Sequence, residues 1–201
     1  MVGSNDKPTP PAAPARPVFP WDPPANFRRR IPDGDNRERL MCDDCGFIHY
    51  ENPKIVVGSV IVAGDRILMA KRAIHPRKGY WTLPAGFMEL HESTEEGAMR
   101  EAMEEANAHI EIDCLIGLYN IPRINQVQMM YRARLASPDF SPGVESTDVA
   151  LYAWDEIPWD QVAFPSVHWA LNHWRETRHL ERFPIFGTPA DWIDRVRAPA
   201  G

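Results

Sequence analysis

Hydrophobic and polar positions follow one another along this chain in an order that predicts several β-strands. β-Branched residues dominate Ile55–Val62, and the Gly-Asp pair that follows is typical of a hairpin turn. The next apolar run, Arg66–Arg72, should therefore return beside the first strand. Three later runs of similar character are also expected to be strands. They are Ile110–Leu118, Gln126–Leu135 and Val149–Trp154.

Two segments show the apolar spacing of three and four residues that is typical of an amphipathic helix. The first should begin near Thr94, because Ser93 and Glu96 form a capping-box pattern, and should end at Asn107, which tolerates the left-handed conformation. Its expected buried side consists of Met99, Ala102, Met103 and Ala106. The second helix, Pro165–Leu180, has its apolar stripe at Val167, Ala170, Leu171 and Trp174. Strands and helices in this order predict an α/β fold with a mixed sheet between helices.

The ends of the chain differ from the middle in composition. Residues 1–26 contain eight prolines and little that could be buried, so we expect a disordered Pro-rich leader. Residues 27–53 form a lead-in segment, residues 54–182 form the main domain, and residues 183–201 form a Pro-containing C-terminal tail.

Composition and charge narrow the classes of function. Hydrophobic residues make up 44% of the 201, enough for one domain with a proper core, and the formal charge of −6 argues against a general nucleic-acid binder. No apolar stretch reaches membrane-spanning length, and the N-terminus lacks the apolar core of a secretory signal. Three cysteines, an odd number, fit a reducing compartment. We therefore expect a cytoplasmic protein that contacts neither nucleic acid nor membrane.

The strongest chemical signal is a cluster of carboxylates in the first predicted helix. Glu101, Glu104 and Glu105 share one face, because positions three and four residues apart are neighbours on a helix. Like charges at this spacing destabilise an isolated helix by about a few tenths of a kcal/mol per pair. Such a cluster is either a solvated helix face or a site for hard divalent cations, which prefer oxygen ligands. A loop containing Gly86 precedes the helix and could bring a backbone carbonyl close to such an ion.

The segment Gly86–Ala108 resembles the Nudix box, G-x5-E-x7-R-E-U-x-E-E-x-G-U, in which U is an aliphatic residue. One position departs from this pattern, because the second glycine of the box is Asn107 here, and Asn still permits a left-handed helix end. The matching positions favour a cation site over a solvated helix face. They are Gly86, Glu92, Arg100, Glu101, Ala102, Glu104, Glu105 and Ala108.

The resemblance implies a Nudix-type α/β/α sandwich and a hydrolase that uses Mg²⁺ or Mn²⁺ to cleave a diphosphate linked to another moiety. Arg100 would pair with Glu92 and hold the glutamates in place. Attack on phosphorus needs an activated water and neutralised phosphate oxygens, which clustered metal ions supply. The metal ligands implied by position are Glu101, Glu104, Glu105 and a backbone carbonyl near Gly86.

Outside the box, the likeness extends over residues 31–180 and is closest to the branch that contains FAD and ADP-ribose pyrophosphatases. It is carried by YENPK at 50–54, WTLPAG at 81–86 and PGVES at 142–146. The NADH-cleaving branch has an SQPWPFPxS segment just after the box, where this chain has IEIDC at 110–114. The resemblance therefore favours FAD or ADP-ribose over NADH or another dinucleotide.

Three further residues are candidates for the substrate site. In related enzymes a glutamate on a loop after the central strands is an extra ligand or a general base, and Glu145 is the candidate here; a surface loop acid is the alternative. Arg72 and Arg123 could bind phosphates, which suit Arg, although solvated surface is the alternative for each. Four strand aromatics could stack on a base but are more often core. They are Trp81, Tyr119, Tyr131 and Trp154.

Cys42 and Cys45 have the C-x-x-C spacing of half a zinc site, which needs four ligands. Several Nudix subfamilies carry a four-cysteine ribbon ahead of the domain. Residues 30–54 resemble its second half, while the first half is missing, so the lead-in is a degenerate ribbon. Two reduced cysteines in a turn are favoured over a filled zinc site. The alternative is a zinc ion bound jointly by the cysteine pairs of two chains.

Three functions remain open. The leading one is a Mg²⁺-dependent pyrophosphohydrolase for a small-molecule nucleotide, with a homodimer allowed because enzymes of this kind often pair. The second is a Nudix-fold nucleotide-sensing module without catalysis. The complete set of acids in the box argues against it. The third is a zinc-ribbon interaction domain, which rests on Cys42 and Cys45 alone.

Overall fold

The computed structural model describes residues 25–190 and Trp192. The chain divides into two compact units, residues 1–51 and residues 52–201, and each is considered by itself. The leader predicted for residues 1–26 lies outside the described residues except for Ala25 and Asn26. Within the described residues, no helix is long and apolar enough to cross a membrane.

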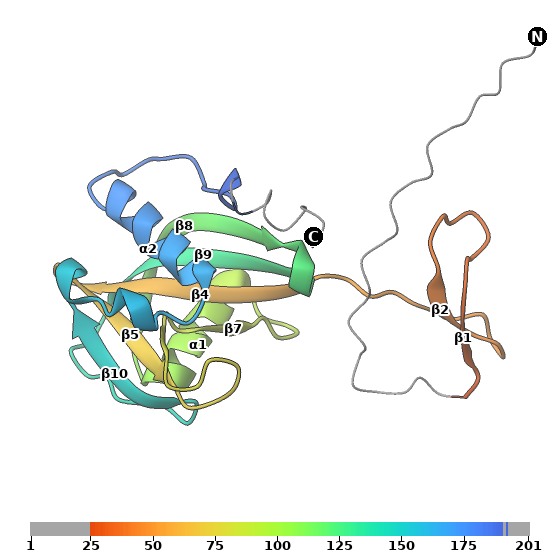
Figure 1. Cartoon of the computed structure of the whole chain (residues 1–201), viewed down its shortest axis with the longest axis horizontal. Helices are drawn as coiled ribbons and strands as arrows, with labels where there is room; N and C mark the ends of the chain where they lie inside the picture. Colours follow the sequence, from red (N-terminus) through yellow and green to blue (C-terminus); the bar gives the residue numbers. More distant parts are fainter. Residues whose placement is uncertain (1–24, 191, 193–201) are drawn as a thin grey trace, which may run out of the picture. The chain divides into compact units, whose positions relative to one another are not determined.

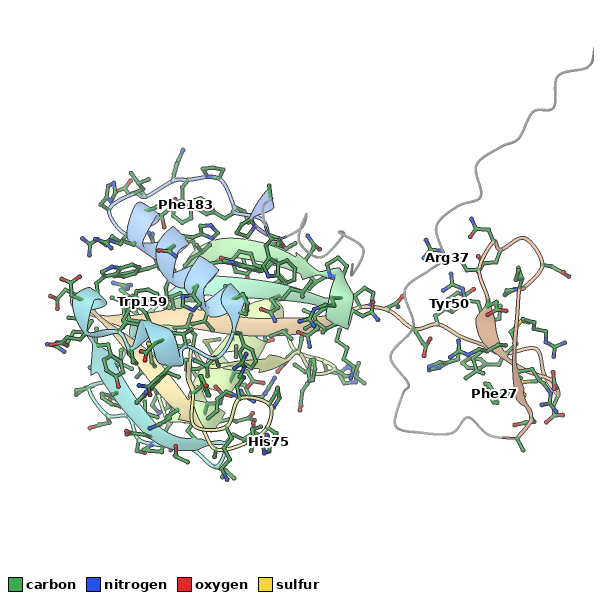
Figure 2. The ribbon with its side chains drawn as sticks, viewed as in Figure 1. Phe27, Arg37, Tyr50, His75, Trp159 and Phe183 are labelled. Atoms are coloured by element: carbon green, nitrogen blue, oxygen red, sulfur yellow. The ribbon has the colours of Figure 1, made fainter. Side chains whose placement is uncertain are left out.

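The first unit contains three short antiparallel strands among its described residues: β1 (Phe27–Arg30), β2 (Arg39–Cys42) and β3 (Ile48–His49). The turn between β2 and β3 is closed by two backbone hydrogen bonds, from Cys42 N to the Phe47 carbonyl at 2.9 Å and from Gly46 N to the Cys42 carbonyl at 3.0 Å. Phe27 meets Phe47 edge-to-face, and Figure 2 shows Phe27 among the side chains of this unit. The hydrophobic pattern did not predict these strands, because they have only two to four residues each.

The described part of the second unit contains seven strands in one mixed sheet, with the order β10-β5-β4-β9-β8 and with β6 and β7 added to β5 and β4 (Figure 1). β4 pairs in parallel with β9 and antiparallel with β5 and β7. The strands are β4 (Lys54–Ala63), β5 (Arg66–Arg72), β6 (Trp81–Thr82), β7 (Ala85–Phe87), β8 (Ile110–Ile121), β9 (Gln126–Leu135) and β10 (Ser146–Tyr152). The helices are α1 (Thr94–Ala106) and α2 (Pro165–Thr177), and the 3₁₀ turns are η1 (Pro122–Ile124), η2 (Trp154–Glu156) and η3 (Trp159–Gln161).

The two helices cover opposite faces of this sheet (Figure 1). On β4, Val60 packs in one apolar cluster with Leu171 of α2, while its neighbour Ile61 packs in another with Ala102 of α1. Because successive strand residues point to opposite faces, a strand covered on both sides is mostly apolar, and in β4 only Lys54 and Ser59 carry polar side chains. The predicted α/β/α arrangement with a mixed sheet is confirmed.

The five predicted strands of the main domain are present, with small differences at their ends. β8 continues to Ile121, and β10 begins at Ser146 and ends before Trp154, which lies in η2. α2 ends at Thr177, three residues before the predicted end at Leu180. Gly86, which was predicted to lie in a loop, belongs to β7 and pairs with Val57 of β4. β6 was not predicted, because two residues are too few to show a period.

Helix α1 begins and ends where the sequence predicts. Ser93 and Glu96 form the capping box, and Asn107 adopts the left-handed conformation with φ of 45°. The predicted buried side was partly wrong, because Met99 is 38% exposed. The buried face instead carries Glu101 and Glu105 among small residues. Those small residues, Gly97, Ala98, Ala102 and Ala106, let the helix pack closely on the sheet.

Part of the predicted C-terminal tail is packed against the sheet. Phe186 N donates to the Ile116 carbonyl at 2.9 Å, and Leu118 N donates to the Phe186 carbonyl at 2.9 Å. The Phe186 ring stacks on His173 of α2 with centroids 4.0 Å apart, and Phe183, labelled in Figure 2, packs against the same core. Residues 183–190 therefore form an additional segment along β8.

Candidate active site

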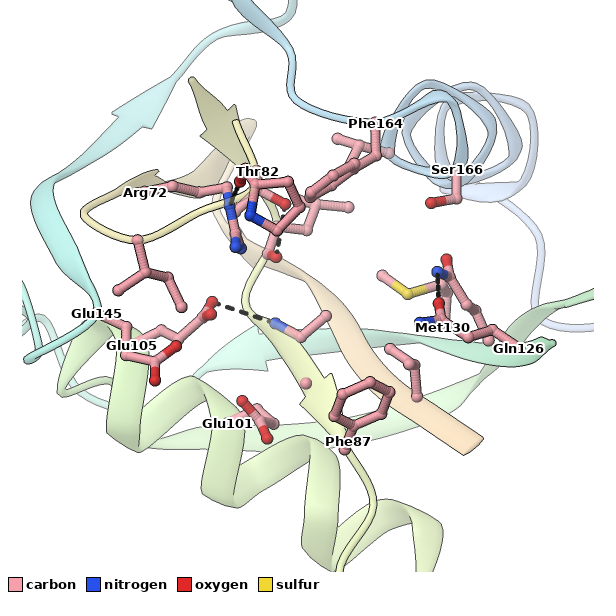
Figure 3. Close-up of a pocket in the computed structure, with 18 of the residues that line it drawn as sticks. Arg72, Thr82, Phe87, Glu101, Glu105, Gln126, Met130, Glu145, Phe164 and Ser166 are labelled. Carbon is pink, nitrogen blue, oxygen red and sulfur yellow. Dashed lines mark hydrogen bonds between the residues drawn. The ribbon is translucent and has the colours of Figure 1, made fainter. Parts of the chain in front are cut away.

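A cavity of about 1250 Å³ is lined by residues from α1, α2, β9 and the loops around them (Figure 3). It brings together every predicted site residue except Glu92, which lies behind it. The predicted residues that line it are Arg72, Gly86, Arg100, Glu101, Glu104, Glu105, Arg123 and Glu145. Two of the α1 carboxylates that line it, Glu101 and Glu105, belong to buried residues, whereas the Glu104 side chain is 57% exposed.

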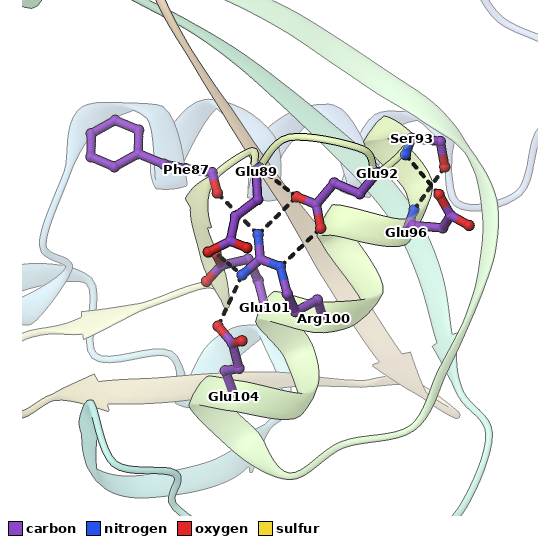
Figure 4. A network of polar contacts seen from close by, with 8 residues as sticks. All are labelled: Phe87, Glu89, Glu92, Ser93, Glu96, Arg100, Glu101 and Glu104. Carbon is purple, nitrogen blue, oxygen red and sulfur yellow. Dashed lines mark hydrogen bonds and ion pairs between the residues drawn. The ribbon is translucent and has the colours of Figure 1, made fainter.

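Arg100, which lines the cavity, forms a two-pronged ion pair with Glu92 (Figure 4). The Arg100 Nε and Nη2 atoms each donate to a different carboxylate oxygen of Glu92 at 2.9 Å. This geometry is the strongest that Arg forms with a carboxylate. Arg100, together with the backbone N–H of Glu89, holds the pKa of Glu92 at about 2. The pair is therefore charged at any physiological pH.

The same guanidinium also binds two of the α1 glutamates. Arg100 Nη1 donates to Glu101 at 2.7 Å and to Glu104 at 2.9 Å, while Nη2 donates to the Phe87 carbonyl at 3.0 Å (Figure 4). The Arg100 side chain is 22% exposed, so these bonds are partly shielded from water. Arg100 therefore connects the loop after β7 to the carboxylates of α1.

Glu101 lies against the backbone of β7. Its side chain is 9% exposed, and burial raises its pKa despite the nearby Arg100. A Cβ atom at Gly86 would lie 2.3 Å from the Glu101 carboxylate. A side chain at this position would therefore displace that carboxylate from its present place.

Glu105 is the more strongly perturbed acid. Burial raises its pKa to about 8, and the negative charges of Glu101 and Glu145 act in the same direction. Its carboxylate accepts one hydrogen bond, from Ala85 N at 3.2 Å (Figure 3). A buried carboxylate with so little compensation is stabilised in its charged form by a nearby cation.

The donor set fits a hard divalent cation. All the candidate ligands are oxygens, which Mg²⁺ and Mn²⁺ prefer. In the region that the structure describes, no three acidic, His or Cys side chains converge closely enough to hold an ion, and Glu101 and Glu104 are both turned onto Arg100. An incoming ion would therefore compete with Arg100 for two carboxylates and meet Glu105 without such competition.

A loop after β9 carries Glu145 to the cavity. Gly143 N donates to the Glu105 carbonyl at 3.0 Å, and a Cβ atom at Gly143 would lie 1.7 Å from the Glu104 carbonyl oxygen. Asn107 Nδ2 donates to the Ser141 carbonyl at 3.2 Å. Asn107, the residue that departs from the box pattern, therefore both ends the helix and donates a hydrogen bond to this loop, which a glycine side chain could not do.

The two predicted phosphate-binding arginines lie in different parts of the cavity lining. Arg72 Nε donates to the Pro76 carbonyl at 2.8 Å, and the guanidinium lies over the Phe164 ring, 5.2 Å from its centroid. Its positive charge reaches Glu105, whose pKa it lowers in part. Arg123 is exposed and lies in η1, beyond the end of β8. Arg72 is therefore the arginine nearer to the acids.

The four strand aromatics belong to the core rather than to a stacking site. Trp81, Tyr119 and Tyr131 are buried in apolar clusters, and the half-buried Trp154 packs beside one of them. The aromatic residues that line the cavity were not predicted. They are Phe87, Phe164, Trp169 and Trp192. Trp169 could have been found, because it is an aromatic residue of α2 outside the predicted apolar stripe, whereas Trp192 follows no pattern.

Comparison with known families gives two matches that together cover both units. The NUDIX domain model matches residues 52–171, and the Nudix N-terminal model, a zinc ribbon, matches residues 25–51. An ADP-ribose pyrophosphatase of Methanocaldococcus jannaschii is 37% identical over 73 residues, which are 36% of this chain and 43% of the relative. An NAD-capped RNA hydrolase of Pseudomonas aeruginosa is 28% identical over 66% of this chain and 48% of its own. The chain thus spans about half the length of these curated relatives.

A solved structure resembles the chain over most of its length. The crystal structure of a NUDIX hydrolase from Nitrosomonas europaea is 45% identical, with a TM-score of 0.76, and the match covers 81% of this chain and 93% of that one.

Proposed function

The chain belongs to the Nudix family, and from this premise we propose that it is a Mg²⁺-dependent pyrophosphohydrolase. Its substrate would be a nucleoside diphosphate linked to another moiety. The observation that carries the proposal is the pair of buried glutamates, Glu101 and Glu105, facing a cavity beside the Arg100–Glu92 ion pair.

Each residue has a distinct role in this proposal. Glu101, Glu104 and Glu105, with the carbonyl near Gly86, would hold the divalent ions. When bound, such ions neutralise phosphate oxygens and make a water molecule nucleophilic at neutral pH. Arg100, fixed by Glu92, would hold Glu101 and Glu104 beside the site until an ion displaces it from them.

Two cavity residues would act on the substrate directly. We assign Glu145 as the general base that accepts a proton from the attacking water, because its loop is bound to α1 and its charge reaches Glu101 and Glu105. Arg72 would bind the oxygens of the phosphate, since its guanidinium lies between these acids and Phe164 (Figure 3).

FAD and ADP-ribose are the favoured substrates. The ADP-ribose pyrophosphatase of M. jannaschii is a relative, and the chain lacks the segment that marks the NADH-cleaving branch. NAD also belongs in the test, because other relatives carry the name NAD-capped RNA hydrolase. We also propose a cytoplasmic location. The three cysteines, all within the described residues, form no disulfide, which is consistent with a reducing compartment.

A substrate panel tests this function. Purified protein with Mg²⁺ should release AMP from FAD or ADP-ribose. NAD, NADH and nucleoside triphosphates are assayed beside them, and chromatography identifies the products. The Glu105→Gln variant is the control for contaminating hydrolases. Release of no nucleoside monophosphate from any compound at any Mg²⁺ concentration would reject the proposal, and tight nucleotide binding without turnover would instead support the sensing module.

A further inference from the structure

The loop that carries Glu145 is attached to the end of α1 by a side chain where the box pattern has none. Asn107 lies at the position of the second glycine, and its Nδ2 atom donates to the Ser141 carbonyl at 3.2 Å, to the Ser141 hydroxyl at 3.1 Å and to the Pro142 carbonyl at 3.2 Å. We infer that Asn107 is a positioning residue that holds this loop so that Glu145 stays at the cavity. The inference rests on the proposed function, in which Glu145 is the general base.

The left-handed backbone at Asn107 does not by itself require these bonds. Asn125, which ends η1, has φ of 51°, close to the 45° of Asn107. The Asn125 side chain makes no hydrogen bond to the described part of the chain. Glycine adopts positive φ without steric cost and would end α1 equally well. What Asn adds at position 107 is therefore a pair of amide N–H groups directed at the loop.

Backbone hydrogen bonds hold the same loop at both of its ends. Ser141 N donates to the Ala106 carbonyl at 2.9 Å, in the last turn of α1, where the carbonyl groups have no partner within the helix. Ala73 N, which follows β5, donates to the Glu145 carbonyl at 2.7 Å. The Asn107 bonds therefore strengthen one of the two attachments between which Glu145 is held, and their loss would loosen that end of the loop.

The position of the Glu145 carboxylate depends on the backbone of its loop. Glu145 is exposed, and its side chain forms no hydrogen bond or ion pair with a described residue. Figure 3 shows it on the same side of the cavity as Glu105, and its negative charge contributes to the raised pKa of Glu105. A general base must lie within hydrogen-bond reach of the attacking water, and a displacement of about 1 Å can lower the rate about 100-fold. Movement of the loop should therefore reduce turnover.

The first test is the kinetics of Asn107→Gly, which keeps the left-handed helix end and removes the amide, on a substrate that the wild type cleaves. We expect kcat to fall about tenfold with KM and the Mg²⁺ dependence within twofold, because the loss of one or two hydrogen bonds corresponds to about this factor. Asn125→Gly is the matched control. It makes the same change at the same backbone conformation, does not line the cavity and should leave kcat unchanged.

A double-variant experiment tests whether Asn107 acts through Glu145. In a Glu145→Gln background, Asn107→Gly should cause no further loss of kcat, because the group that it positions is already absent. A general weakening of α1 would instead lower kcat by the same factor in both backgrounds. Equal losses in the two backgrounds would therefore overturn the inference.

Hydrogen exchange by mass spectrometry over residues 137–146 separates this inference from the hydrolase proposal, because it does not depend on activity. The amide of Ser141 should exchange faster in Asn107→Gly than in the wild type or in Asn125→Gly. Unchanged exchange or an unchanged kcat in Asn107→Gly would overturn the inference, while cleavage by the wild type would keep the hydrolase proposal standing. If no compound is cleaved but exchange still depends on Asn107, the hydrolase proposal fails and the attachment of the loop by Asn107 stands.

Discussion

The two units of this chain hold their charged side chains in different ways. In the second unit, Arg100 makes five hydrogen bonds from a side chain that is 22% exposed. In the first unit, Arg28 and Arg30 both pair with Asp43, but their side chains are 69% and 51% exposed. Exposed ion pairs contribute only about 0–1 kcal/mol each, whereas a shielded network orders every group in it.

The difference extends to the groups that would bind metal. The second unit gathers three carboxylates beside one guanidinium, whereas the first unit has one cysteine pair and matches the Nudix N-terminal model without a second pair. There, Asn26 Nδ2 donates to Asp44, and Asp43 N donates to the Asn26 carbonyl at 2.8 Å. A ribbon fold can therefore be held by hydrogen bonds and surface ion pairs, whereas the hydrolase site needs its full set of acids.

The largest effect is expected at the acids of the second unit. Glu105→Gln removes a charge that would bind the divalent ion, so turnover should fall by orders of magnitude while the fold is retained, because a neutral amide costs less to bury than a carboxylate. Steady-state kinetics at saturating Mg²⁺ measures the loss, and circular dichroism checks the fold. Glu111→Gln, at an exposed ion pair with Arg134, is the control. Wild-type turnover in the Glu105 variant would contradict the metal assignment.

A pair of conservative arginine changes compares the two units directly. Arg100→Lys loses the two-pronged contact with Glu92, and we expect a decrease of about 10–100-fold in activity or Mg²⁺ affinity, as for other groups that orient metal ligands. Arg30→Lys at the exposed pair with Asp43 should change neither activity nor melting temperature measurably. Equal losses of activity from Arg100→Lys and Arg30→Lys would show that shielding of an ion pair from water does not distinguish the two units.

The pKa of Glu105 predicts how pH affects the metal-free second unit. Because the pKa is about 8 in the folded protein and its ordinary value is 4.5, the folded state binds more protons between these values. Stability should therefore fall as pH rises from 4.5 to 8 and then level off, and Mg²⁺ affinity should rise over the same range. Denaturant unfolding in EDTA from acidic to alkaline pH measures this, and Glu105→Gln should flatten the slope. A wild-type slope unchanged in the variant would argue against this carboxylate as its source.

The smallest effect is expected at the cysteine pair of the first unit. Cys45 is exposed, so Cys45→Ser should leave hydrolysis and stability unchanged, and elemental analysis should find less than one zinc per chain. A stoichiometric zinc that disappears in Cys45→Ser would contradict this. If such a protein were also a homodimer by light scattering, the two chains would be pooling their pairs.

The sequence predicts those features whose residues lie close together along the chain. The strand found at Lys54–Ala63 was predicted at Ile55–Val62 because burial on both faces makes it rich in β-branched residues, and most acids of the site were found because one segment contains them. Met99 was misplaced because α1 turns Glu101 and Glu105, rather than its larger apolar residues, toward the protein. The spacing of apolar residues identifies the buried face of a helix only when that face is apolar, and the buried face of α1 contains two glutamates.

The part of the cavity lined by β9, α2 and Trp192 could not be predicted, because these residues are distant in sequence. Ser166 and Trp192 acquire meaning only through the fold that brings them to one cavity.

The contact between Gly143 and the end of α1 couples two parts of the site through the backbone. A Cβ atom at Gly143 would lie 1.7 Å from the Glu104 carbonyl oxygen, and Gly143 N donates to the Glu105 carbonyl, so a side chain there would force the loop or the last turn of α1 to shift. Glu104 and Glu105 lie on that turn, and Glu145 lies on the loop. A change at this single backbone contact would therefore disturb the acids on both sides of it.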